Sequence, residues 1–167
     1  MKFQPLFLIG LAASALILTG CPVGISFPLA AQKDAAAYDP KLEGTWACSD
    51  AAAEMQRVTI SKGEAKGTYT IEVLERGELY ALDTDLFTAW VTELEGRRFL
   101  VAKPDNENKF YHYCFEFTGG GELRTYDVGL KVGGVDAVSS VETFREEVRL
   151  SLKDPECLSS PYDWVRE

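Results

Sequence analysis

The chain has 167 residues and a formal net charge of −9 at pH 7, because 26 Asp and Glu outnumber 17 Lys and Arg. So acidic a surface repels phosphate groups, which argues against nucleic acid as a partner. The single histidine limits the catalytic triads and metal sites that the chain can build.

The first segment is typical of a secretory signal. Lys2 supplies a positive charge, and an uncharged apolar run over residues 5–18 follows it. This run is too short to span a bilayer comfortably, since a spanning helix needs about 20 apolar residues. It ends on the sequence LTGC at residues 18–21.

The sequence LTGC resembles the lipobox of bacterial lipoproteins. The resemblance implies that residues 1–20 are a signal peptide, cut between Gly20 and Cys21, and that the thiol of Cys21 carries a diacylglycerol. The new N-terminus is then acylated, and several acyl chains hold a protein stably in a membrane. We therefore expect a membrane-anchored protein of the bacterial cell envelope that faces the periplasm. Pro22 stands where an Asp would resemble the inner-membrane retention signal, which favours the outer membrane.

Two other interpretations of the leader remain open. Cleavage after Ala31 would release a soluble, secreted protein. A longer membrane helix is the second alternative, because no charge occurs between Lys2 and Lys33. Pro22 and Pro28 argue against that helix, since interior prolines break helices.

Residues 21–40 mix Pro, Ala and Gly without a strand or helix period. This composition predicts a flexible tether between the membrane and the domain. The domain itself is expected over residues 41–167.

Short alternating segments separated by turns follow the tether, a pattern typical of a β-meander. The predicted strands cover residues 42–48, 56–61, 67–74, 79–94, 97–103, 109–117, 123–130 and 162–167. Glu95-Gly96 predicts a tight hairpin between two of them.

The period changes near residue 139. Ser139 and Glu142 are spaced as a capping box at a helix start. The apolar residues Val141, Phe144, Val148 and Leu152 follow at helical spacing and form one stripe. Asp154-Pro155 ends the helix, because the residue before proline avoids helical angles.

This order of elements predicts a mainly β fold, an up-and-down antiparallel meander that closes into a barrel of about eight strands. One amphipathic helix precedes the last strand. Pairing of the last strand with the first would remove both exposed sheet edges.

Three cysteines besides Cys21 lie in the predicted domain: Cys48, Cys114 and Cys157. An exported protein meets an oxidising environment, so one disulfide with one thiol left over is expected. Antiparallel pairing of the first and last strands brings the end of one near the start of the other. We therefore predict a Cys48–Cys157 disulfide.

The sequence Gly44-Thr45-Trp46 in the first strand resembles the G-x-W motif of the lipocalins. The resemblance implies that Trp46 packs inside the closed end of a barrel, and that Arg166 from the last strand covers its ring as a cation–π pair. The helix before the last strand departs from the usual lipocalin order. The wider pattern is similar to that of small lipocalin-like bacterial lipoproteins, which have no established activity to transfer.

An eight-stranded barrel can be filled by side chains or hold one small ligand. The aromatic residues expected to point inward favour a largely filled interior, with a small apolar pocket as the alternative. They are Trp46, Tyr69, Phe87, Tyr111, Tyr113, Phe115 and Phe117.

Candidate chemistry is sparse. His112 and Cys114 share a strand face and could supply two zinc ligands or a nucleophile pair. A structural zinc site requires four ligands, however. The acidic turns at 83–85 and 105–108 lack the calcium-loop pattern. Phosphate-loop, nucleophile-elbow and dinucleotide motifs do not occur. We expect no enzyme activity, metal or cofactor, although a pair of carboxylates for glycoside cleavage is not visible from sequence.

Two functions are consistent with these features. The first is a lipid-anchored, non-catalytic binding or interaction module, with a protein of the envelope as a candidate partner for its surface. The second is a lipocalin-like carrier of a small apolar ligand.

Overall fold

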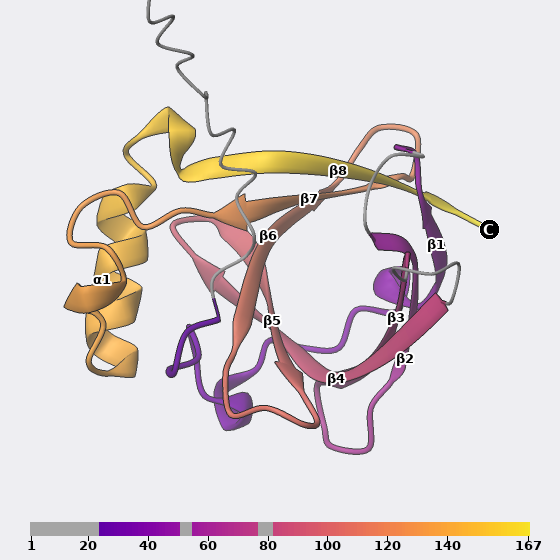
Figure 1. The fold of residues 1–167 in the computed structure, drawn as a ribbon, viewed down its shortest axis with the longest axis horizontal. Helices are drawn as coiled ribbons and strands as arrows, with labels where there is room; N and C mark the ends of the chain where they lie inside the picture. The colour runs from indigo at the N-terminus through magenta and orange to yellow at the C-terminus, as the bar shows by residue number, and fades with distance from the viewer. Residues whose placement is uncertain (1–23, 51–54, 77–81) are drawn as a thin grey trace, which may run out of the picture.

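The computed structural model describes residues 24–50, 55–76 and 82–167, and these form a closed antiparallel barrel of eight strands in chain order (Figure 1). The predicted fold class is confirmed, including the helix that precedes the last strand. The strands are β1 (Gly44–Cys48), β2 (Met55–Lys62), β3 (Thr68–Arg76), β4 (Leu82–Leu94), β5 (Arg97–Pro104), β6 (Tyr111–Phe117), β7 (Leu123–Val128) and β8 (Leu158–Arg166).

The barrel closes where β1 pairs with β8. Trp46 lies opposite Arg166, and Cys48 lies opposite Trp164. The C-terminal Glu167 donates its backbone N–H to the carbonyl of Thr45 at 2.9 Å. The sheet therefore has no free edge between its first and last strands, as the sequence pattern predicts.

Successive side chains of each strand point alternately into and out of the barrel, so every second side chain lies inside. The inner cluster is built around Trp46, Tyr69, Phe115 and Trp164, which are all at least 97% buried. Branched residues of β2 and β3, such as Val58 and Ile71, fill the space between the rings. The predicted inward face of these strands is thus confirmed.

A second apolar layer covers the outside of the barrel over β4, β5 and β6. It joins Phe99 and Val101 of β5 to Phe144 and Val148 of α1, the helix Val141–Ser151. Figure 1 shows α1 beside the ring rather than across its opening. The helix therefore does not close a barrel end, and its apolar stripe is buried against the outer wall.

The helix begins one residue later than the sequence predicts. Ser140, not Ser139, is the N-cap, and its hydroxyl accepts from the backbone N–H of Thr143 at 3.1 Å. The Thr143 hydroxyl accepts in return from the N–H of Ser140 at 2.9 Å. Thr replaces the predicted Glu142 in the capping box because its short side chain also reaches the backbone of the cap.

Residues 24–40 are not the flexible tether that their composition suggests. Ile25 forms a β-bridge with Phe110, and Leu29 is fully buried against the outer wall. The segment then continues through the 3-10 helices Gln32–Asp34 and Pro40–Leu42 to the start of β1. The remaining 3-10 turns, Val135–Ala137 and Pro155–Cys157, flank α1.

Gly20 and Cys21, and with them the predicted cleavage and lipidation sites, lie outside the described residues. Within the part of the chain that the structure describes, none of the helices has the length and hydropathy that a membrane crossing requires.

Candidate functional site

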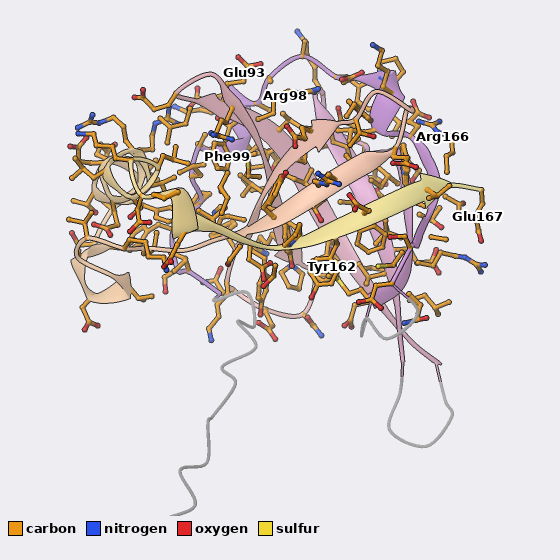
Figure 2. The ribbon with its side chains drawn as sticks, turned by 90° about the horizontal axis from the view of Figure 1, so that it is seen from above. Glu93, Arg98, Phe99, Tyr162, Arg166 and Glu167 are labelled. Carbon is orange, nitrogen blue, oxygen red and sulfur yellow. The ribbon has the colours of Figure 1, made fainter. Side chains whose placement is uncertain are left out.

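One end of the barrel is closed by the pair that the sequence predicts. The guanidinium carbon of Arg166 lies 4.4 Å from the centroid of the Trp46 ring. Arg166 also donates from Nη2 to the carbonyl of Lys41 at 2.6 Å, and the indole N–H of Trp46 donates to the carbonyl of Leu42 at 3.0 Å. Figure 2 shows Arg166 beside Glu167 at the end of β8, well beyond Tyr162.

The backbone and surroundings of Gly44 explain why a glycine stands two residues before Trp46. Its φ is +131°, a backbone conformation that side chains rarely adopt, and a Cβ there would lie 3.3 Å from Nη1 of Arg166. A larger residue would strain the strand and press on the guanidinium that covers Trp46.

A polar network that sequence reasoning missed completes this closed end. The backbone N–H of Asp39 donates to the hydroxyl of Tyr69 at 2.7 Å, and the Asp39 carboxylate pairs with Arg98 at 2.9 Å. The Arg98 guanidinium lies 4.7 Å from the ring centroid of Phe115. Burial raises the pKa of Tyr69, so its phenol stays neutral. Its hydroxyl accepts the Asp39 N–H and so fixes the segment that covers this end of the barrel. No spacing in the sequence links Asp39 to Arg98.

The opposite end of the barrel is lined by rings that are only partly buried: Phe87, Tyr111, Tyr113 and Tyr162. The Phe87 and Tyr111 rings meet edge to face, with centroids 6.5 Å apart. Trp46, Tyr69 and Phe115 are buried as expected, whereas these rings and Phe117 keep some exposure. The interior is thus most tightly filled around the closed end.

Among the described strands, Asp127 of β7 is the one buried carboxylate on the inner face of the barrel. It is 8% exposed, opposite Tyr113 on β6 and Ser159 on β8. Neither carboxylate oxygen has a hydrogen-bond partner of acceptable geometry in the described residues. Burial raises the pKa of Asp127 to about 6, an effect that the nearby Ser160 hydroxyl partly offsets.

A cavity of about 310 Å³ lies outside the barrel, beneath α1. Its walls are largely apolar, with His112 as the one ionisable side chain among them. The lining residues are Ile25, His112, Val128, Gly129, Leu130, Gly134, Val135 and Phe144.

His112 and Cys114 face this outer layer together, as their strand spacing predicts. His112 accepts from the backbone N–H of Leu29 through Nε2 at 3.1 Å, and its ring meets Phe144 edge to face. Burial lowers the pKa of His112 to about 3 and raises the pKa of the Cys114 thiol. A neutral imidazole engaged as an acceptor and a protonated thiol make a poor nucleophile pair.

The predicted Cys48–Cys157 disulfide is wrong. Cys48 lies opposite Trp164, seven residues further along β8 than Cys157, which corresponds to about 23 Å at 3.3 Å per strand residue. Cys157 instead donates its thiol to the carbonyl of Gly129 at 3.2 Å, and Cys48, Cys114 and Cys157 are all free. The order of the strands is as predicted, but the two cysteines sit at opposite ends of β8.

Across residues 24–50, 55–76 and 82–167, no group of three or more His, Cys, Asp and Glu side chains is arranged to hold a metal ion. Comparison of the chain with protein-family models, with curated proteins and with solved structures finds no match.

Proposed function

We propose that the protein is a lipid-anchored lipoprotein of the bacterial cell envelope, with a non-catalytic β-barrel that binds or interacts with another molecule. Acyl chains on Cys21 hold it in the membrane, facing the periplasm, and the absence of Asp at position 22 favours the outer membrane. The observation that carries the proposal is the sequence LTGC at residues 18–21, directly after a short apolar signal.

The packing of residues 24–31 supports cleavage at Cys21 over the alternative cut after Ala31. Leu29 is 0% exposed, and its carbonyl accepts from Nη1 of Arg145 at 3.0 Å. The carbonyl of Ala30 accepts from the indole of Trp90 at 2.9 Å. Removal of this segment would uncover the outer apolar layer, at a cost of several kcal/mol for the loss of Leu29 alone.

The state of His112 and Cys114 supports a non-catalytic role. Both side chains are buried; the acceptor nitrogen of His112 is occupied by the Leu29 N–H, and burial lowers the pKa of His112 and raises the pKa of the Cys114 thiol. The proposal is therefore one of binding through the barrel or its surface.

Metabolic labelling with radioactive palmitate tests the anchor. Wild-type protein and a Cys48→Ser control should incorporate label and sediment with membranes, whereas Cys21→Ser should do neither. Unlabelled wild-type protein that fractionates like Cys21→Ser would contradict the proposal. A pull-down of the acylated protein from solubilised envelopes, with Cys21→Ser as the control, then tests for a protein partner.

A second candidate function is the transport of a small apolar molecule, favoured by the apolar cavity beneath α1. Native mass spectrometry of protein from its own envelope should then show a retained small molecule. Titration with a fluorescent fatty acid should saturate, and Val135→Trp at the cavity wall should weaken binding more than Val165→Trp, which is equally exposed but lies on β8. No retained molecule and no saturable binding would exclude the carrier.

A further inference from the structure

We infer that the β5–β6 turn and the adjoining segment after β7 face the lipid bilayer, so that the closed end of the barrel, with Trp46 and Arg166, points away from the membrane. The inference rests on the proposed acylation of Cys21. It adds the orientation of the barrel and identifies the surface that meets lipid.

The first step is the fixed position of Gly24 and Ile25. Ile25 and Phe110 exchange two backbone hydrogen bonds, at 2.9 and 2.8 Å. Gly24 lies so close to Lys109 that a Cβ would approach its Cδ to 2.9 Å. The chain is therefore held against the start of β6, not free to swing around the domain.

The second step is the length of chain between this clamp and the lipid. Cys21 is three residues before Gly24, and three residues of extended chain reach at most about 11 Å. The acyl chains enter the bilayer at Cys21. The β5–β6 turn, over residues 105–110, must then lie near the headgroups.

The third step is the position of the other end of the barrel. The strands that leave this side are long: β6 alone has seven residues, which span about 23 Å at 3.3 Å per residue. The turns at 95–96 and 118–121, next to the closed end, thus lie beyond the reach of the three-residue link.

The surface beside the clamp fits a lipid interface. Val135, which lines the same cavity as Ile25, is 46% exposed, and Val132 is 63% exposed. The β5–β6 turn and the segment after β7 carry exposed charges of both signs: Lys109 and Lys131, and Asp105, Glu107 and Asp136. The overall acidic chain would be repelled by anionic headgroups, so the acyl anchor supplies the attraction and the short link sets the orientation.

The experiment uses full-length, acylated protein in phosphatidylcholine vesicles that contain a lipid with a nitroxide headgroup. In a Cys48→Ser background, a fluorophore is attached at Asn108→Cys in the β5–β6 turn or at Gly120→Cys at the far end. Both positions are exposed, and a Cβ at Gly120 meets only ordinary contacts. We expect severalfold stronger quenching at position 108 than at position 120.

Insertion of twenty Gly and Ser residues between Val23 and Gly24 should abolish the difference, because the barrel can then rotate freely. Equal quenching at the two positions without the insertion, or a difference that survives it, overturns the orientation. Membrane sedimentation and palmitate labelling of the same samples separate the two proposals. Labelled protein with equal quenching contradicts the orientation alone, whereas unlabelled protein contradicts the anchor and the orientation together.

Discussion

Glu147 accepts two hydrogen bonds from one backbone amide: the N–H of Gly133 lies 2.9 Å from its Oε1 and 3.0 Å from its Oε2. The same carboxylate accepts from the N–H groups of Val132 and Gly134. Glu147 is 5% exposed, so the central turn of α1 fixes the segment that follows β7. Hydrogen bonds from amide donors stabilise a buried carboxylate in the absence of a cationic partner side chain.

Glu147→Ala should therefore lower the free energy of unfolding by about 3 kcal/mol, because it leaves three amides unpaired in a partly buried site. Urea denaturation measures the loss, and hydrogen exchange at residues 132–134 should accelerate. Glu146→Ala is the matched control, since Glu146 pairs with Arg149 on the exposed face of α1, and exposed pairs add little to stability. Similar losses in the two variants would refute the bracing role of Glu147.

Arg166→Ala should lower the free energy of unfolding by about 1–2 kcal/mol. It removes a cation–π contact of about 0.5–1 kcal/mol together with the hydrogen bond to the Lys41 carbonyl. Tryptophan emission should also shift to the red as water reaches Trp46. Arg57→Ala is the control, because Arg57 forms an exposed salt bridge with Glu167. If Arg57→Ala lowered the free energy of unfolding by as much as Arg166→Ala, the contact of Arg166 with the Trp46 ring would contribute no more than an exposed salt bridge.

His112 should make stability depend on pH. Its pKa is about 3 in the fold, below the ordinary value of 6.5, because burial disfavours the imidazolium. The unfolded chain therefore binds a proton first as the pH falls. The contribution is complete above pH 6.5 and declines towards pH 3, by about 1.4 kcal/mol per pH unit. In urea titrations at several pH values, His112→Gln should lack this slope, and an unchanged slope would assign the effect to another group.

Asp127 should act in the opposite direction. Its pKa is raised to about 6, so the folded chain keeps a proton that the unfolded chain loses above pH 3.8. Stability therefore falls as the pH rises from about 4 to 6, by about 1.4 kcal/mol per unit. Between these limits the slopes of Asp127 and His112 offset each other.

Asp127→Asn removes only one of these two slopes. The variant should be more stable than wild type at pH 7, and it should show the steeper His112 dependence between pH 4 and 6. Asp105→Asn, at an exposed position in the β5–β6 turn, serves as the control. A variant less stable than wild type at pH 7 would show that the Asp127 carboxylate has a stabilising partner.

The described cysteines should react as three separate thiols. Under native conditions a thiol reagent should modify Cys48 first, because Cys48 is partly exposed while Cys114 and Cys157 are at least 97% buried. Burial also raises the pKa of each thiol, which slows the reaction further. Reducing agent should leave the melting temperature unchanged. A lower melting temperature after reduction would show that the protein contains a disulfide, against this prediction.

The resemblance of Gly44-Thr45-Trp46 to the lipocalin motif implied the pair of Trp46 and Arg166, and the structure contains this pair. Gly44 and Trp46 are two residues apart on β1, and Arg166 is the last residue of β8. Once the order of strands is known, antiparallel pairing brings these residues together. The disulfide prediction used the same pairing and failed, since it required the register as well as the order. β1 pairs only with the C-terminal part of β8, at residues 164–166, so the start of β8, next to Cys157, lies away from Cys48.

The sequence by itself determined the strand order, the helix and the inward face of the barrel, because alternation and helical spacing are properties of neighbouring residues. Only the tertiary structure decided what covers the outer wall. Residues 24–35 have no periodicity, and they are held by partners far along the chain, such as His112 for Leu29 and Arg145 for its carbonyl. Contacts of this kind depend on the surface that the finished barrel offers, so no local pattern encodes them.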